Sequence, residues 1–386
     1  MRICLLAALV LVLAGCGANA FNAKDSKADL LTIAVWNVQS LFDGEEDGTE
    51  YREYRSSADW TAEKYQGRIT ALSRAIVQMF QPDTSISASA LRSGETTPAP
   101  AVLGLVELER ASALEDLAQG ELSKYGYLWA AFANASGAPL GLGVLSRFPL
   151  LDVRAHSITI ENATIPRPIL EVRIEVRGQE LVFLVCHWKS KVGGAEATTP
   201  LRRAASRVVQ RRLGELQASE PEIPVIVMGD LNENHDEFYR SQGELFPALL
   251  IDDPDAARRA QGRVQDFLVL SGEKPPRALS FNESYGDSIL PLYSPWFEDV
   301  HVGSYYYKDN WETIDHFLLS PDFFSDGSDA PDKVGNSRWQ YEGFSVLNYH
   351  PFVRTTTNIP NSYVPRTGKG LSDHLPLLLY LRRKGD

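Results

Sequence analysis

The stretch Gly229-Asp230-Leu231-Asn232 places a carboxylate and a carboxamide close together, directly after the apolar residues 224–227. That apolar run is Pro-Val-Ile-Val, and its β-branched character predicts a buried strand that ends near the acid. Glycine lets the backbone turn sharply, and carboxylate and amide oxygens at a strand end can hold a water molecule or a hard cation. Taken alone, the stretch is better explained as an ordinary Asp/Asn turn. Whether it is part of a functional site depends on what stands at the other strand ends.

Polar side chains of the kinds used in catalysis stand at the ends of several other apolar segments. These residues are Asn37, Glu107, His187, Asp315, Asp373 and His374. Each has a structural explanation of its own, such as a turn cap, an ion pair with arginine or a buried acid bonded to the backbone. Buried charges are costly unless they are paired or bound to a metal, so several acids that each abut an apolar strand indicate one shared site containing a cation. The candidate ligands are rich in oxygen and the His/Cys spacing of zinc sites is absent, which favours Mg²⁺ or Mn²⁺, with Ca²⁺ also compatible.

Short strands and two amphipathic helices are predicted to position these side chains. Strands are expected at residues 31–36, 102–106, 141–146, 169–176, 180–186, 224–227, 314–319 and 375–381. Helices are expected at residues 60–80 and 199–216, because apolar side chains recur there at helical spacing. The second helix is expected to start with Thr199 as its cap and Pro200 in its first turn.

The remaining segments are interpreted as surface or core. Residues 84–101 are rich in Ser, Thr, Ala and Pro without periodicity, which predicts a surface loop. Arg203, Arg207 and Arg211 form a stripe on the second helix, which a solvated face explains better than phosphate binding. Four aromatic residues are expected in the core rather than in a stacking platform: Tyr305, Tyr306, Tyr307 and Trp311. No Pro/Gly linker divides the core segments, so one domain is predicted over residues 29–386.

The overall composition is that of a globular protein. The 386 residues are 44% hydrophobic and 23% charged, which argues against disorder and fibrous structure. The formal net charge of -12 argues against a protein that coats nucleic acid through general electrostatic attraction, while a small catalytic contact to phosphate stays compatible with it. Cys186 lies in an apolar run and is interpreted as a core residue, not as a nucleophile.

The N-terminus carries the features of a bacterial export signal. Arg2 precedes an apolar run at residues 3–13, which falls short of the roughly 20 residues that a membrane-spanning helix needs and is typical of a signal peptide. The sequence Leu-Ala-Gly-Cys that ends at Cys16 resembles the lipoprotein signal, in which the cysteine becomes the lipid-modified N-terminus. We therefore expect a signal peptide at residues 1–15 and a flexible tether at residues 16–28. These features predict an extracytoplasmic protein anchored in the cell envelope, in the outer membrane if the cell is Gram-negative.

Six short motifs resemble, in the same order, those of the endonuclease/exonuclease/phosphatase superfamily, which has the deoxyribonuclease-I-like fold. They are Trp36-Asn37-Val38-Gln39-Ser40-Leu41-Phe42-Asp43, Gly104-Leu105-Val106-Glu107, Cys186-His187-Trp188-Lys189-Ser190-Lys191, Gly229-Asp230-Leu231-Asn232, Thr313-Ile314-Asp315-His316 and Ser372-Asp373-His374-Leu375-Pro376. The resemblance covers nearly the whole chain after the signal peptide. It implies an α/β fold, a four-layer sandwich of two packed mixed β-sheets flanked by helices, with metal-dependent hydrolysis of phosphoester bonds at one end of the sheets.

The resemblance also implies where a metal and the attacking water would lie. Glu107 matches the central Mg²⁺ ligand, with Asn37 and Asp373 at or near the metal. Asp230 would orient or deprotonate the attacking water, with Asn232 beside it.

Two histidines carry the remaining implied roles. His374, oriented by Asp315, would donate to a phosphoryl oxygen, since an imidazole held by a carboxylate stays aimed and charged near neutral pH. His187 matches a histidine that assists the leaving group; abasic-site repair enzymes carry Tyr there, so His favours the secreted nucleases and phosphodiesterases. Lys189 and Lys191 are candidate contacts to the substrate phosphate, although a solvated loop explains them about as well.

The leading hypothesis is a monomeric, lipid-anchored, Mg²⁺-dependent phosphodiester hydrolase that acts outside the cytoplasm on DNA or RNA. A phospholipid or inositol phosphate is the alternative substrate, because the anchor places the enzyme beside lipid and the acidic balance disfavours nucleic acid. No long apolar loop suited to insertion into a bilayer is visible in the sequence, which keeps nucleic acid ahead. A third hypothesis, a non-catalytic surface binding protein on the same fold, is disfavoured because the main set of site residues is complete.

Overall fold

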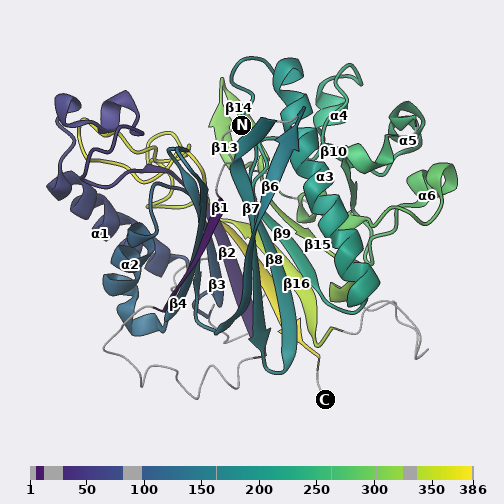
Figure 1. The fold of residues 1–386 in the computed structure, drawn as a ribbon, viewed down its shortest axis with the longest axis horizontal. Coiled ribbons are helices and arrows are strands. Elements are labelled where there is room, and N and C mark those ends of the chain that lie inside the picture. The colour runs from purple at the N-terminus through teal and green to yellow at the C-terminus, as the bar shows by residue number, and fades with distance from the viewer. Residues whose placement is uncertain are drawn as a thin grey trace.

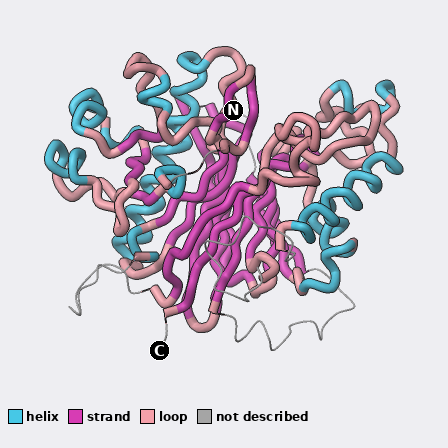
Figure 2. The backbone as a smooth tube through the Cα atoms, turned by 180° about the vertical axis from the view of Figure 1, so that it is seen from behind, coloured by secondary structure: helices cyan, strands magenta, loops and turns pink. Residues whose placement is uncertain are grey.

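Two mixed β-sheets face each other at the centre of the structure, and helices cover their outer sides (Figure 1). The computed structural model describes residues 6–12, 29–80, 98–161, 163–261, 263–298, 300, 302–324 and 337–384. Seen from behind, the strands again form the central layers, with helices on both flanks (Figure 2). The predicted α/β sandwich is therefore confirmed.

Among the described residues, the first sheet has seven strands in the order β1-β4-β5-β3-β2-β17-β16. They are β1 (Leu6–Val12), β2 (Leu30–Leu41), β3 (Val102–Leu108), β4 (Trp129–Ala135), β5 (Gly141–Ser146), β16 (Trp339–Val346) and β17 (Leu377–Arg383). The neighbouring strands β2 and β3 run parallel at the centre of this sheet, so their carboxyl ends lie at the same edge.

The second sheet has eight strands in the described part of the chain, in the order β10-β11-β12-β15-β9-β8-β7-β6. They are β6 (Leu150–Ile160), β7 (Ala163–Val176), β8 (Gln179–His187), β9 (Val225–Asp230), β10 (Leu249–Ile251), β11 (Leu268–Ser271), β12 (Leu292–Tyr293) and β15 (Asp315–Leu319). Here β8 and β9 run parallel and β15 runs antiparallel to β9. A separate hairpin is formed by β13 (Tyr305–Tyr307) and β14 (Asn310–Glu312).

The helices lie outside the two sheets (Figure 1). They are α1 (Ala62–Gln78), α2 (Ser112–Gln119), α3 (Ala195–Ser219), α4 (Glu237–Arg240), α5 (Pro254–Ala260) and α6 (Leu279–Tyr285). In α1 the side chain of Thr61 caps the first turn by accepting a hydrogen bond from the Lys64 backbone N–H. Ile69, Leu72 and Ile76 recur on one face and are buried, each contributing about 1.5–3 kcal/mol relative to an exposed position.

An apolar layer joins the inner faces of the two sheets. Leu105 of the first sheet belongs to the same cluster as Phe183 and Met228 of the second. Gly104 permits the close approach, because a Cβ atom there would lie 2.8 Å from the Met228 Cε atom. The packing therefore fixes how far apart the two sets of strand ends stand.

The predicted strands and the helix at residues 60–80 are confirmed, whereas the predicted start of the second helix is wrong by about one turn. Helix α3 begins at Ala195, so Pro200 lies inside it. The hydroxyls of Thr198 and Thr199 donate to the carbonyls of Gly194 and Ala195, and these bonds support the earlier start.

Several predictions about the N-terminus concern residues that the structure does not describe. Cys16 and the tether at residues 16–28 lie outside the described residues, as does most of the predicted loop at 84–101. The predicted signal peptide overlaps β1, which pairs antiparallel with β4. No helix in the described part of the chain is long and apolar enough to cross a membrane. The signal peptide and the lipid anchor stay predictions.

Candidate active site

Strand register alone brings several of the predicted site residues to one place. Asn37 lies near the end of β2 and Glu107 near the end of the parallel strand β3. His187 and Asp230 end the parallel strands β8 and β9 and are paired in register. Asp315 begins β15 and is paired with Asp230 in the antiparallel register. The strands thus fix the backbones from which these side chains converge.

The turn after β9 depends on glycine. Gly229 has a φ of +133°, and a Cβ atom there would lie 2.0 Å from the Cys186 carbonyl oxygen. The carboxylate Oδ1 of Asp230 accepts a hydrogen bond from the Asn232 backbone N–H at 2.9 Å. The Asn232 amide in turn donates to the Trp188 carbonyl at 3.1 Å. The sequence indicated a turn and a site as alternatives. In the structure Asp230 and Asn232 form the turn and also line the cavity described below.

A buried ion pair that no local sequence pattern indicates anchors this turn. Glu233 Oε1 accepts from Arg202 Nε of α3 at 2.8 Å, and both side chains are fully buried. Glu233 Oε2 accepts from the backbone N–H groups of Ala248 and Leu249. The arginines flagged in the sequence bond elsewhere, for example Arg207 to Asp266 at 3.0 Å.

The predicted metal ligands lie beside Asp230. The Asn37 amide donates to Glu107 Oε1 at 3.2 Å and to Asp230 Oδ2 at 3.0 Å. Glu107 Oε2 accepts from the backbone N–H of Ser40 at 2.8 Å and from its hydroxyl at 3.1 Å. Glu107 also has a φ of +72°, a conformation that non-glycine residues adopt at a cost and that clusters at functional sites.

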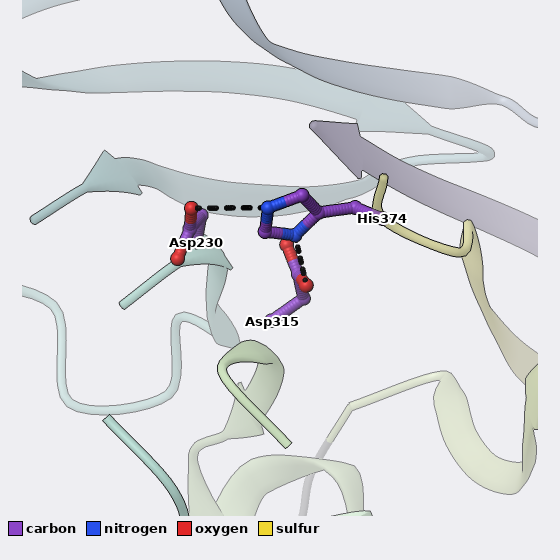
Figure 3. A group of neighbouring side chains, drawn as sticks. All are labelled: Asp230, Asp315 and His374. Carbon is purple, nitrogen blue, oxygen red and sulfur yellow. Dashed lines mark hydrogen bonds and ion pairs between the residues drawn. The ribbon is translucent and has the colours of Figure 1, made fainter. Parts of the chain in front are cut away.

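His374 is held by one acid and faces another (Figure 3). Its Nδ1 lies 2.7 Å from Asp315 Oδ2, and its Nε2 lies 4.0 Å from Asp230 Oδ2. Nε2 is also 4.0 Å from Asp373 Oδ1. Burial opposes the charged imidazole, but the nearby carboxylates, Asp315 foremost, raise its pKa well above the usual value. The imidazole is therefore protonated on both nitrogens at neutral pH, and its Nε2–H points toward Asp230.

The pKa values of Asp230 and His187 are shifted as well, and burial raises the pKa of Asp373. Burial and the charge of Asp315 raise the pKa of Asp230 to about 7. His187 is buried, with Nε2 3.6 Å from Glu107 Oε1 and 3.8 Å from Asp230 Oδ2. Burial and the positive charge of Arg167 lower the pKa of His187 well below its usual value, so this imidazole is neutral.

These side chains open into a cavity of about 370 Å³. Its lining residues are Tyr51, Glu107, Arg167, His187, Ser190, Lys191, Val192, Asp230, Asn232, Tyr305, Tyr307, Glu312, Ile314, Asp373 and His374. The expectation that the tyrosines are core residues is wrong for Tyr305 and Tyr307, whose short hairpin places them at the wall. The ammonium of Lys189 bonds to Ser190 and Val192 of its own loop. Lys191 lines the cavity, and its ammonium is paired with Glu237 at 2.7 Å and lies 3.6 Å from Glu312.

Arg167 and Tyr51 line the cavity and were missed by sequence reasoning. Arg167 lies on β7, and its guanidinium donates to the Trp188 carbonyl. Neither residue stands at the end of an apolar run, so no local pattern distinguishes it from an ordinary surface residue.

The chemistry of the donor set fits a divalent cation. Glu107, Asp230 and Asp373 bring carboxylates to one cavity wall. One oxygen of Asp230, one of Asp315 and one ring nitrogen of His374 lie within 4.8 Å of one another. Oxygen ligands and an excess of negative charge are what Mg²⁺, Mn²⁺ and Ca²⁺ require.

Comparison with known proteins identifies the protein family. Residues 32–248 match the model described as the Endonuclease/Exonuclease/phosphatase family. The chain belongs to this family. Enzymes of the family hydrolyse phosphoester bonds and generally use divalent metals, which agrees with the acidic donor set. No curated protein matches the sequence.

Solved structures with a similar chain path are distant in sequence. Truncated Caenorhabditis elegans TDP2 is 13% identical, with 92% of this chain and 98% of that chain covered and a TM-score of 0.49. A family protein from Bacteroides thetaiotaomicron is 14% identical, with 92% and 95% covered and a TM-score of 0.49. A mannosyl-6-phosphatase of the same species is 14% identical, with 91% and 99% covered and a TM-score of 0.47.

Proposed function

We propose that this family member is a metal-dependent phosphodiester hydrolase that acts on DNA or RNA outside the cytoplasm, anchored through Cys16. The observation that carries the catalytic part is His374, held by Asp315 and directed at Asp230 on the wall of an oxygen-rich cavity. A raised histidine pKa and an acid of pKa about 7 side by side supply a proton donor and a proton acceptor near neutral pH.

Glu107 and Asp373 are the residues proposed to hold the cation. Asn37, whose Oδ1 accepts from the Gln39 backbone N–H at 2.9 Å, orients Glu107 and Asp230 through its amide N–H groups. When bound, a divalent ion neutralises charge on the phosphoryl group and stabilises the transition state by several kcal/mol. The bonds from Ser40 to Glu107 Oε2 fix that carboxylate, so the orientation of Oε1 toward the cavity is set before substrate arrives.

The chain's own groups divide the proton transfers. Asp230 accepts a hydrogen bond from the attacking water and takes its proton, while the bond from Asn232 N–H keeps the second oxygen fixed. His374 donates its Nε2 proton to a phosphoryl oxygen on the opposite side. His187 is neutral, so it stabilises the leaving oxygen by donating a hydrogen bond rather than a full proton.

Features of the cavity wall favour a nucleic acid as substrate. The rings of Tyr305 and Tyr307 are stacked with centroids 6.3 Å apart at an angle of 19°, and stacking on aromatic rings contributes about 1–3 kcal/mol per base. Arg167 lines the same cavity and supplies a local positive charge that the acidic surface lacks, whereas Lys191 is paired with Glu237. A small headgroup is the second candidate, because a cavity of about 370 Å³ lies near the lower limit of ligand pockets.

A substrate screen tests the proposal. The soluble protein lacking residues 1–16 is incubated with DNA, RNA, sphingomyelin vesicles and inositol phosphates in the presence of Mg²⁺, Mn²⁺ or Ca²⁺. We expect hydrolysis of nucleic acid that is abolished by a chelator and reduced by at least about 100-fold in Asp230→Ala and His374→Ala. Asp287→Ala, at an exposed position, is the control with unchanged activity.

Three results would change the assignment. Hydrolysis of lipid or inositol phosphate alone replaces the substrate and keeps the site. Full activity in both alanine variants refutes the site. Absence of both metal binding and hydrolysis supports the non-catalytic binding protein.

The anchor has its own test. The full-length protein is expected in the detergent-soluble membrane fraction with a lipid on Cys16, and Cys16→Ser is expected to lose both. Mass spectrometry of the mature N-terminus decides, since an unmodified Cys16 refutes the anchor.

A further inference from the structure

A second group of carboxylates lies in the segment that follows β2. Residues 43–50 have the sequence Asp-Gly-Glu-Glu-Asp-Gly-Thr-Glu, which we term the acidic loop. The loop joins the end of β2 to Tyr51, which lines the catalytic cavity. None of its acids has a role in the hydrolysis proposed above.

Two acids of the loop and one acid at the end of β3 converge. Asp47, Glu50 and Glu109 each place a carboxylate oxygen within 4.8 Å of the others. Asp47 is exposed, whereas Glu50 is 2% and Glu109 is 6% exposed. Oxygens that bind one Ca²⁺ at about 2.3–2.6 Å can be no more than about 5 Å apart, so these three can share one ion.

Glu109 has a buried oxygen without a partner. Its Oε2 accepts from the Asp43 backbone N–H at 2.7 Å. Its Oε1 is buried and has no hydrogen-bond partner among the described residues. A buried carboxylate oxygen left unpaired costs about 1–3 kcal/mol or more, so the arrangement calls for a ligand at that atom.

The charges around the cluster point to a cation as that ligand. Arg110 is shared by three carboxylates, with Nε 3.3 Å from Asp43, Nη1 3.5 Å from Glu45 and Nη2 3.1 Å from Asp47. Within the described residues, neither Glu50 nor Glu109 forms an ion pair. The guanidinium of Arg110 is therefore shared by three of the five acids, and the two buried acids, Glu50 and Glu109, are left without an ion pair among the described residues.

We propose that the acidic loop and Glu109 form a second divalent-cation site, separate from the catalytic centre and best suited to Ca²⁺, whose occupancy holds Tyr51 at the cavity wall. Carboxylates on a loop without regular secondary structure suit Ca²⁺ better than Mg²⁺, which demands tighter octahedral geometry. The link to the cavity is short, because the Tyr51 ring packs on Phe42 with centroids 5.1 Å apart. Glu109 N–H also donates to the Leu41 carbonyl, which ties the cluster to the end of β2.

The experiment separates this site from the catalytic one by mutation. In a Glu107→Gln/Asp373→Asn background, which removes the proposed catalytic ligands, calorimetric titration with CaCl₂ is expected to show one bound ion per chain. Adding Asp47→Asn, a substitution at an exposed position, is expected to weaken binding by at least about tenfold. Glu46→Gln is the matched control, because Glu46 belongs to the same loop but bonds to Ser56 N–H and Oγ.

Hydrogen exchange tests the effect on Tyr51. At a Ca²⁺ concentration 100 times the dissociation constant, exchange of the amides in residues 43–51 is expected to slow by up to about 100-fold. The same slowing is expected with Glu46→Gln and not with Asp47→Asn.

Three outcomes overturn the proposal. They are loss of all Ca²⁺ binding in the Glu107→Gln/Asp373→Asn background, binding that Asp47→Asn leaves unchanged, and amide exchange in residues 43–51 that Ca²⁺ does not slow. These readouts are independent of hydrolysis, so the proposal can fail while the proposed function stands.

Discussion

Replacing Asp315 with asparagine tests the proton donor most directly. Asp315 Oδ2 lies 2.7 Å from His374 Nδ1, and both side chains are buried. Asparagine keeps the shape of the side chain and an oxygen that can accept the same hydrogen bond, but it removes the charge. A hydrogen bond to a charged group contributes about 1.5–3 kcal/mol, and one pKa unit corresponds to about 1.4 kcal/mol. The pKa of His374 is therefore expected to fall by about 1–2 units.

The sign of the pH effect follows from the two shifts. In the wild type the pKa of His374 is raised, so activity that needs its proton is present at neutral pH and is lost only as pH rises through that raised value. In Asp315→Asn this loss moves to lower pH by about 1–2 units. The pKa of Asp230 also falls, because Asp315 is one of the groups that raise it. Both limbs of the pH–rate profile should thus move in the acidic direction.

The assay is the pH dependence of kcat on bis-nitrophenyl phosphate at saturating Mg²⁺. Above the shifted pKa, kcat is expected to fall by about 10- to 100-fold. Asp322→Asn is the matched control: Asp322 is bonded by the Ser320 hydroxyl just beyond the far end of β15. A profile that keeps its alkaline limb in Asp315→Asn, or an equal loss in the control, would refute the assigned pairing.

Two further predictions concern stability. Gly229→Ala is expected to lower the free energy of unfolding by about 3 kcal/mol or more, because a Cβ atom would lie 2.0 Å from a backbone carbonyl oxygen. Gly67→Ala on α1, where a Cβ atom meets nothing within 4 Å, is expected to raise the free energy of unfolding by about 0.5–1 kcal/mol. Thermal unfolding of the two variants checks the contrast, and equal effects would contradict it. Burial raises the pKa of Glu171, but His156 and Arg212 outweigh it and lower the value to about 2. This lowered pKa stabilises the folded protein fully above the pKa of 4.5 in the unfolded chain, and the stabilisation, about 3 kcal/mol in all, is lost as pH falls toward 2. In Glu171→Gln the urea midpoint is therefore expected to fall less steeply with pH than in the wild type. An equally steep fall in the variant would be inconsistent with the prediction.

The strand ends that carry chemistry could be predicted because the signal is local. A β-branched run that changes abruptly to Gly-Asp indicates both the strand and the residue at its end, and Asp230 is found there. The pairing of such ends across two sheets is not local. The pairing depends on strand register, as between Asp315 and Asp230, which periodicity does not reveal. Only the resemblance to the family motifs indicated that these strand ends form one site.

Residues that act through long-range contacts were beyond sequence reasoning. Arg202 has the same helical context as the neighbouring arginines, and only its burial against Glu233 distinguishes it. Strand β6 was also missed, because most of its residues are partly exposed and its pattern lacks a continuous apolar run. The segment Leu6–Val12 shows the opposite ambiguity, since a short apolar run is compatible with a signal peptide and with a strand.

The β13–β14 hairpin links the entrance of the cavity mechanically to the proton donor. Its strands pair with each other, and Tyr305 forms a backbone bridge to His374, with the two rings 4.7 Å apart. We therefore expect a substrate that displaces the hairpin to move the imidazole too. If His374 is the proton donor, a poor fit at the entrance is then expected to lower the rate of the chemical step as well as the affinity.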